Sequence, residues 1–137
     1  MQTNDRDFLH EEYEHLRRSL PVGVWSSAIA DEVYRPRGQM YRHSGGRNFQ
    51  QLCDLIGQTA KVGLTEAEYY DGFREHCYSW TERLTITEFR GATDEPIYND
   101  EGDQIGYEMH PYFTAVDRHG RTYTVFADHL MDVRPAD

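Results

Sequence analysis

The sequence predicts an α+β fold, in which N-terminal helices pack on a small antiparallel β-meander in the C-terminal half. Two observations predict this class: apolar residues recur at helical spacing over residues 8–20, and they alternate with polar residues after Trp80. A chain of 137 residues with 38% hydrophobic and 13% aromatic residues can form one compact core. We expect a single domain over residues 1–137, with a mainly helical part that holds a strand and a basic loop in residues 1–80, and antiparallel strands in residues 81–137.

The first element has the pattern of an amphipathic helix. Thr3 or Asn4 can cap its N-terminus, and Pro21 ends it. Acidic residues at its start and arginines near its end suit the two ends of the helix dipole. One stripe along the helix is apolar and consists of Phe8, Leu9, Tyr13, Leu16 and Leu20. We expect this stripe to lie on a core or on a partner.

The middle of the chain is predicted from shorter patterns. Residues 22–34 contain β-branched and aromatic residues and have no convincing helix cap, so we interpret part of them as a strand. A short helix is expected to begin near Asn48. A longer helix is predicted over residues 65–79, because Thr65 and Glu68 have the spacing of a capping box.

The C-terminal part is predicted to be strands. Residues 84–89 alternate between apolar and polar, and residues 91–106 have the composition of an irregular hairpin or a long loop. Residues 112–116 and 122–126 are strong strand candidates. Gly120 between them can take the left-handed position of a tight hairpin loop. Together these segments predict an antiparallel sheet.

The order of these elements resembles a small SH3-like barrel. Residues 127–130 have the pattern of a single helical turn and residues 131–133 that of a last short strand, so the resemblance covers residues 82–134. It implies a recognition module for peptides, protein surfaces or nucleic acids rather than an enzyme. A simple α+β meander would give the same pattern, and both alternatives stay open here.

A glycine-rich basic segment between Arg35 and Arg47 differs from the rest of the chain. It holds four arginines and three glycines in a protein of formal net charge -10. Glycines allow turns that point several backbone N–H groups one way, and guanidinium groups bind anions as forks. The predicted anion- or partner-binding residues are Arg35, Arg37, Arg42, Ser44, Gly45, Gly46 and Arg47. The alternative is a solvated connection whose arginines pair with acidic residues of the same chain.

Charge is distributed unevenly along the sequence. Residues 35–61 carry a net charge of +4, whereas residues 62–103 carry -8. Such an acidic chain disfavours direct binding to nucleic acid, because most of its surface would repel the phosphates. The acidic residues predicted to face a partner are Asp94, Glu95, Asp100, Glu101 and Asp103.

The sequence contains no catalytic or metal-binding motif of high specificity. It has neither a C-x-x-C nor an H-E-x-x-H pattern, so no metal, cofactor or catalytic residue is predicted. Cys77 and His76 diverge on a helix, and Cys77 could meet His110 or His129 only through the fold. With two cysteines the chain is not a disulfide scaffold.

We therefore expect a non-enzymatic recognition protein that binds a protein partner through the basic loop and the acidic face. One version mimics nucleic acid against a defence nuclease, as acidic inhibitors encoded by some phages do. The alternative is a small phosphorylated-ligand-binding or enzymatic domain that uses Arg42 and Arg47. The sequence has no membrane-length apolar run and no apolar leader, so we expect a cytoplasmic location and no membrane partner. The oligomeric state is left open.

Overall fold

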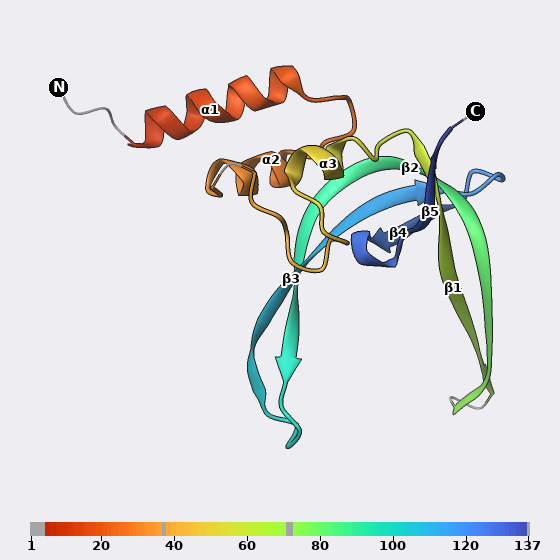
Figure 1. The fold of residues 1–137 in the computed structure, drawn as a ribbon. Coiled ribbons are helices and arrows are strands. Elements are labelled where there is room, and N and C mark those ends of the chain that lie inside the picture. Colours follow the sequence, from red (N-terminus) through yellow and green to blue (C-terminus); the bar gives the residue numbers. More distant parts are fainter. Residues whose placement is uncertain (1–4, 37, 71–72, 137) are drawn as a thin grey trace.

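The structure of the chain is a computed structural model that describes residues 5–36, 38–70 and 73–136. Its helices are α1 (Asp5–Ser19), α2 (Ser26–Val33) and α3 (Phe49–Cys53). They are followed by strands β1 (Gln58–Tyr70), β2 (Phe73–Tyr98), β3 (Gln104–Val116) and β4 (Thr122–Phe126), the short 3-10 helix η1 (Ala127–His129) and strand β5 (Met131–Pro135). The α+β class and the antiparallel sheet are confirmed (Figure 1).

Strand β2 organises the sheet, whose strand order is β4-β3-β2-β1-β5. Its first half pairs with β1 and its second half pairs with β3. The register with β3 shifts between Ile86 and Glu88 and again between Phe89 and Gly91. Because an unpaired residue in a bulge bends the strand, these two shifts fit the strong curvature of β2 in Figure 1.

Two long hairpins extend from this bend to the same side of the molecule (Figure 1). We call residues 62–82, from β1 and β2, arm 1; its base is the register pair Val62 and Glu82. We call residues 93–110, from β2 and β3, arm 2; its base is the pair Thr93 and His110. The helices lie on the opposite side of the bend.

The strands form an open sheet with β4 at one edge and β5 at the other. Strand β5 returns to pair with β1 at Gln58↔Pro135 and Thr59↔Arg134. The sheet is not closed into a barrel, and the SH3-like resemblance is not confirmed.

The helices pack in sequence above the bend of β2. The backbone N–H of Phe89 donates to Gly23 O at 2.8 Å, and the N–H of Trp25 donates to Phe89 O at 2.9 Å, which fixes the start of α2 on β2. Helix α1 contacts α2, so the predicted arrangement of all N-terminal helices on the sheet is not confirmed. Among the described residues, no helix combines the length and the apolar character that a membrane span requires.

The core joins one face of the sheet to α2, α3 and the loop that precedes α3. Phe89 and Phe113 lie at its centre, fully buried, with ring centroids 5.1 Å apart. Because alternate residues of a strand point to the same face, the apolar positions of four strands meet here. The buried apolar strand residues include Ala60, Val62, Leu84, Ile86, Phe89, Pro111, Phe113, Ala115 and Val125.

The predicted helix over residues 65–79 is wrong, because these residues belong to β1 and β2. The register pairs Tyr70 with Phe73 and leaves Asp71 and Gly72, outside the described residues, between the two strands. An Asp-Gly pair between two apolar segments is a strong signal for a two-residue hairpin loop. That signal outweighs the capping-box spacing on which the helix prediction depended.

The predicted strand within residues 22–34 is also wrong, because α2 occupies most of this segment. Val24 alone forms an isolated bridge, parallel to Phe89. As a helix, this segment buries Ala28 and Ile29 on one face while its other faces reach solvent, and this burial favours the helix over a strand. The predicted short helix is confirmed as α3, where Asn48 and Gln51 form a capping box.

Candidate binding surfaces

The basic loop is built around Ser44, which is 1% exposed. Its hydroxyl donates to Tyr41 O at 2.7 Å and accepts from the backbone N–H of Arg47 at 2.9 Å. Gly45 and Gly46 follow with φ of 71° and 77°, in the left-handed region that glycine adopts without strain. The loop is therefore a tight turn with its own internal hydrogen bonds.

Arg47 points into the protein rather than toward solvent. Its Nη1 donates to Ser44 O at 3.0 Å and to Ala127 O at 3.2 Å. The second bond crosses from the loop to the start of η1. Arg47 thus ties two distant segments together, and both Nη1 hydrogens are used in doing so.

Arg35 is likewise engaged within the protein. Its Nε donates to Asp31 Oδ2 at 3.0 Å, and its guanidinium carbon lies 3.9 Å from the centroid of the Tyr41 ring. Burial, followed by the negative charge of Asp31, raises the pKa of Tyr41 above its usual value. The Tyr41 hydroxyl therefore stays protonated and donates to Asp31 Oδ2 at 3.3 Å.

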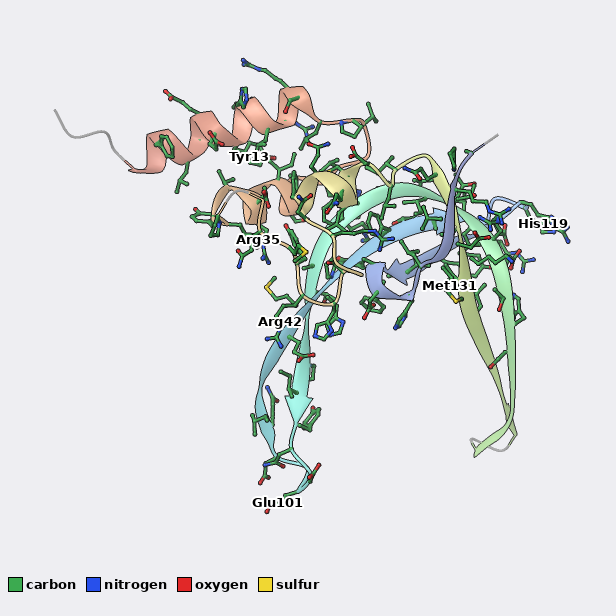
Figure 2. The ribbon with its side chains drawn as sticks, in the orientation of Figure 1. Tyr13, Arg35, Arg42, Glu101, His119 and Met131 are labelled. Carbon is green, nitrogen blue, oxygen red and sulfur yellow. The ribbon has the colours of Figure 1, made fainter. Side chains whose placement is uncertain are left out.

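Arg42 is the exposed member of the three described arginines of the loop. Its side chain is 80% exposed, and its Nη2 lies 3.9 Å from Glu108 Oε1. Figure 2 shows it beside β3, near the base of arm 2. A cavity of about 230 Å³ lies next to it, lined by Arg35, Gln39, Met40, Arg42, Glu108 and Met109. Arg37 lies outside the described residues.

The acidic residues predicted to face a partner gather on arm 2. Asn99 closes its tip, because Asn99 Oδ1 accepts from the backbone N–H groups of Glu101 at 3.0 Å and Asp103 at 2.9 Å. The side chains of Asp100, Glu101 and Asp103 are exposed, and no ion pair reaches them from the described part of the chain. Figure 2 shows Glu101 at the far end of the arm. Asp94 and Glu95 lie in β2 of the same arm, with side chains outside the described part.

The two arms carry the whole net charge of the protein. Arm 1 contains five acidic residues and one arginine, and arm 2 contains six acidic residues and neither lysine nor arginine. The rest of the chain contains 13 acidic and 13 basic residues. A formally neutral body thus bears two negatively charged hairpins.

A cluster of titratable side chains at the base of arm 2 was not found from the sequence. Glu108 Oε2 lies 2.8 Å from His43 Nε2 and 3.6 Å from His110 Nε2. The two imidazole rings stack with centroids 4.2 Å apart. Asp128, from η1, lies beside both histidines. Only the spacing Glu108-x-His110, which places both residues on one face of a strand, could have suggested part of this cluster.

Comparisons of this chain with protein family models, with curated proteins and with solved structures gave no match. Any inference about function therefore depends on charge, geometry and burial. Three features carry it: the acidic arms, exposed Arg42 and the cluster around Glu108.

Proposed function

We propose that the protein is a non-enzymatic recognition protein that binds a positively charged protein surface with its two acidic arms. The observation that carries this proposal is the separation of charge: the net charge of -10 lies on arms 1 and 2, and the body is formally neutral. Hairpins that extend from one side of the molecule can contact a single partner together (Figure 1). Complementary charge steers such an encounter and excludes partners of like charge.

The partner that fits this surface best is a nucleic-acid-binding protein. Such proteins expose grooves lined with Lys and Arg that neutralise phosphates. The carboxylates of Asp100, Glu101 and Asp103 are solvated and unpaired among the described residues, so they can enter such a groove without first losing an internal ion pair. The protein would then act as an acidic inhibitor that occupies the groove in place of nucleic acid, as expected for a phage-type antagonist of a defence nuclease.

The basic loop contributes less to this surface than its composition predicts. Arg35 and Arg47 have partners inside the protein, which leaves Arg42 as the described arginine of the loop that can reach a partner. Arg42 and Arg47 therefore do not form a clamp around one phosphate. This geometry gives the phosphorylated-ligand alternative less support than the recognition function.

A competition experiment tests the proposal. A labelled DNA duplex is bound to each of a panel of basic nucleic-acid-binding proteins, and its displacement by this protein is followed by fluorescence anisotropy. We expect displacement from at least one of them, weakening as salt rises. A triple variant, Asp100→Asn, Glu101→Gln and Asp103→Asn, should displace about tenfold less well, since three exposed ion pairs of roughly 0.5 kcal/mol each are lost.

A matched control separates the arm from the overall charge. Glu11→Gln, Glu14→Gln and Asp54→Asn remove the same formal charge from the body, and this variant should displace DNA as the wild type does. Equal losses in both variants would show that only net charge matters. Failure of the wild type to displace DNA from any panel member would exclude the nucleic-acid-mimic version.

A further inference from the structure

We propose that His43, Glu108, His110 and Asp128 bind one transition-metal dication, with Zn²⁺ as the preferred ion. The four residues come from three segments that are distant in sequence: the basic loop, β3 and η1. Ligand atoms of His43, His110 and Asp128 all lie within 4.8 Å of one another. Glu108 Oε2 lies 2.8 Å from His43 Nε2 and 3.6 Å from His110 Nε2, and would add a second oxygen donor to these three residues.

The distances in the cluster fit a small coordination sphere. A tetrahedral zinc ion with ligands at about 2.0–2.1 Å holds its donor atoms about 3.3 Å apart. The distances from Glu108 Oε2 to His43 Nε2 and His110 Nε2, 2.8 and 3.6 Å, lie on either side of that value. Each of the two histidine nitrogens therefore lies at a distance from Glu108 Oε2 that suits two ligands of one ion.

One donor atom of the cluster lacks the partner that a buried nitrogen requires. His43 Nε2 is buried and has no hydrogen-bond partner among the described residues. Its contact with Glu108 Oε2 is close, but it is not aligned as a hydrogen bond. Leaving a buried polar atom unpaired destabilises the folded state. A metal ion would supply the missing partner for the lone pair.

The basic loop holds His43 in place. His43 has φ of 55°, a conformation that is uncommon outside glycine and persists only where the surrounding structure imposes it. Buried Ser44 fixes the turn from inside, and the Arg47 side chain joins it to Ala127, the residue before Asp128. The same bond that removes Arg47 from solvent therefore sets the position of one proposed ligand relative to another.

The surroundings and the donor types indicate which ion would bind. The rings of His43 and His110 are nearly parallel, at 5°, and lone pairs in two parallel ring planes do not meet, so one ring must tilt for both to bind one ion. Phe126 packs edge-on against His110 at 5.9 Å and limits the tilt of that ring, whereas the His43 side chain is 31% exposed and can turn. Two imidazoles with two carboxylates suit Zn²⁺ and its first-row neighbours better than Mg²⁺ or Ca²⁺, which prefer oxygen ligands.

Titration of the chelator-treated protein with Zn²⁺ alone tests the site. Calorimetry should give one ion per chain, and zinc should raise the melting temperature, because a ligand that binds only the folded state stabilises it. Co²⁺ should give the visible absorption of a four-coordinate ion with nitrogen and oxygen ligands. The double variant His43→Gln, His110→Gln should lose about 100-fold in zinc affinity.

The control variant His15→Gln, His119→Gln removes two exposed histidines outside the cluster and should bind zinc as the wild type does. Circular dichroism verifies that both variants are folded. Absence of saturable zinc binding by the wild-type protein would overturn the proposal without any variant. So would equal zinc affinities of the cluster variant and the control variant.

Discussion

At the scale of single residues, Asp117 is the carboxylate most completely held by its neighbours. It directly follows β3 and accepts hydrogen bonds from the backbone N–H groups of His119 at 2.8 Å and Arg121 at 2.9 Å. The Tyr123 hydroxyl donates to its second oxygen at 3.1 Å. Desolvation opposes ionisation, but these bonds and the charge of Arg121 outweigh it and hold the pKa of Asp117 below its usual value.

The depressed pKa of Asp117 predicts how stability depends on pH. A carboxyl whose pKa is lower in the folded state stabilises the fold above its unfolded pKa, about 3.9, and this contribution is lost as the pH falls through the folded pKa. The Asp117→Asn variant should therefore be less stable than the wild type at neutral pH, and the difference should shrink in acid. Urea unfolding of both proteins over a range of pH measures this. A difference that stays constant with pH would show that ionisation of Asp117 plays no part.

At the scale of elements, the loop from Tyr41 to Arg47 depends on two glycines in different ways. A Cβ at Gly45 would lie 2.6 Å from Arg47 Nη1, whereas a Cβ at Gly46 would meet nothing within 4 Å. Both glycines have similar positive φ, so their substitution by alanine carries a similar backbone cost. At Gly45 a side chain would in addition collide with the Arg47 side chain, whereas at Gly46 it would not.

The pair Gly45→Ala and Gly46→Ala therefore isolates the contribution of Arg47. Gly46→Ala should cost about 1 kcal/mol of unfolding free energy through backbone strain alone. Gly45→Ala should cost about 2 kcal/mol, because the bond from Arg47 Nη1 to Ala127 O is also displaced. Urea unfolding at neutral pH measures both. Equal losses would mean that this bond does not stabilise the folded state.

The hairpins show what the sequence could and could not predict. The segments 112–116 and 122–126 were predicted as strands because their alternation is regular, and they lie in β3 and β4. In arm 1, the capping-box spacing of Thr65 and Glu68 favours a helix, whereas the Asp-Gly pair favours a hairpin. The prediction followed the capping box and was wrong. The accumulation of acidic residues was visible in the sequence, but their placement on two arms depends on the pairing of β1 with β2 and of β2 with β3.

The cluster of proposed metal ligands could not be predicted from local sequence patterns either. His43, Glu108 and Asp128 are brought together by long-range contacts, and no fixed spacing connects them in the sequence. The glycines of the loop predicted its turns, but the sequence did not show that Arg35 and Arg47 turn toward the protein. Arg47 turns inward because a backbone carbonyl of η1 lies within its reach.

At the scale of the whole molecule, the separation of charge has a cost in stability. Like charges held close together on each arm repel one another in the folded state, and salt screens this repulsion. Under the proposed function, the acidic arms would serve binding at the expense of stability, a compromise that is common at functional surfaces.

The thermal stability of the protein should consequently rise with salt. Between about 0.01 M and about 1 M the Debye length falls from about 30 Å to about 3 Å, and we expect the melting temperature to rise by about 4 °C for each 1 kcal/mol of repulsion removed. The variant neutralised at Asp100, Glu101 and Asp103 should show a smaller rise, and the variant neutralised at Glu11, Glu14 and Asp54 the same rise as the wild type. Differential scanning calorimetry makes the comparison. An equal rise in all three proteins would place the repulsion elsewhere.

Because both arms share the continuous strand β2, their relative direction depends on backbone geometry at Thr87 and Arg90, which lack a register partner in β3. Deleting either residue would remove the bulge and straighten the strand there, while the residues beyond it would keep their partners in β3 and their faces of the sheet. Under the proposed function, the width of the partner surface that both arms can contact would therefore depend on residues that lie outside the arms. Inserting or deleting one residue at these two positions would therefore change the relative direction of the arms without changing the acidic residues that they carry.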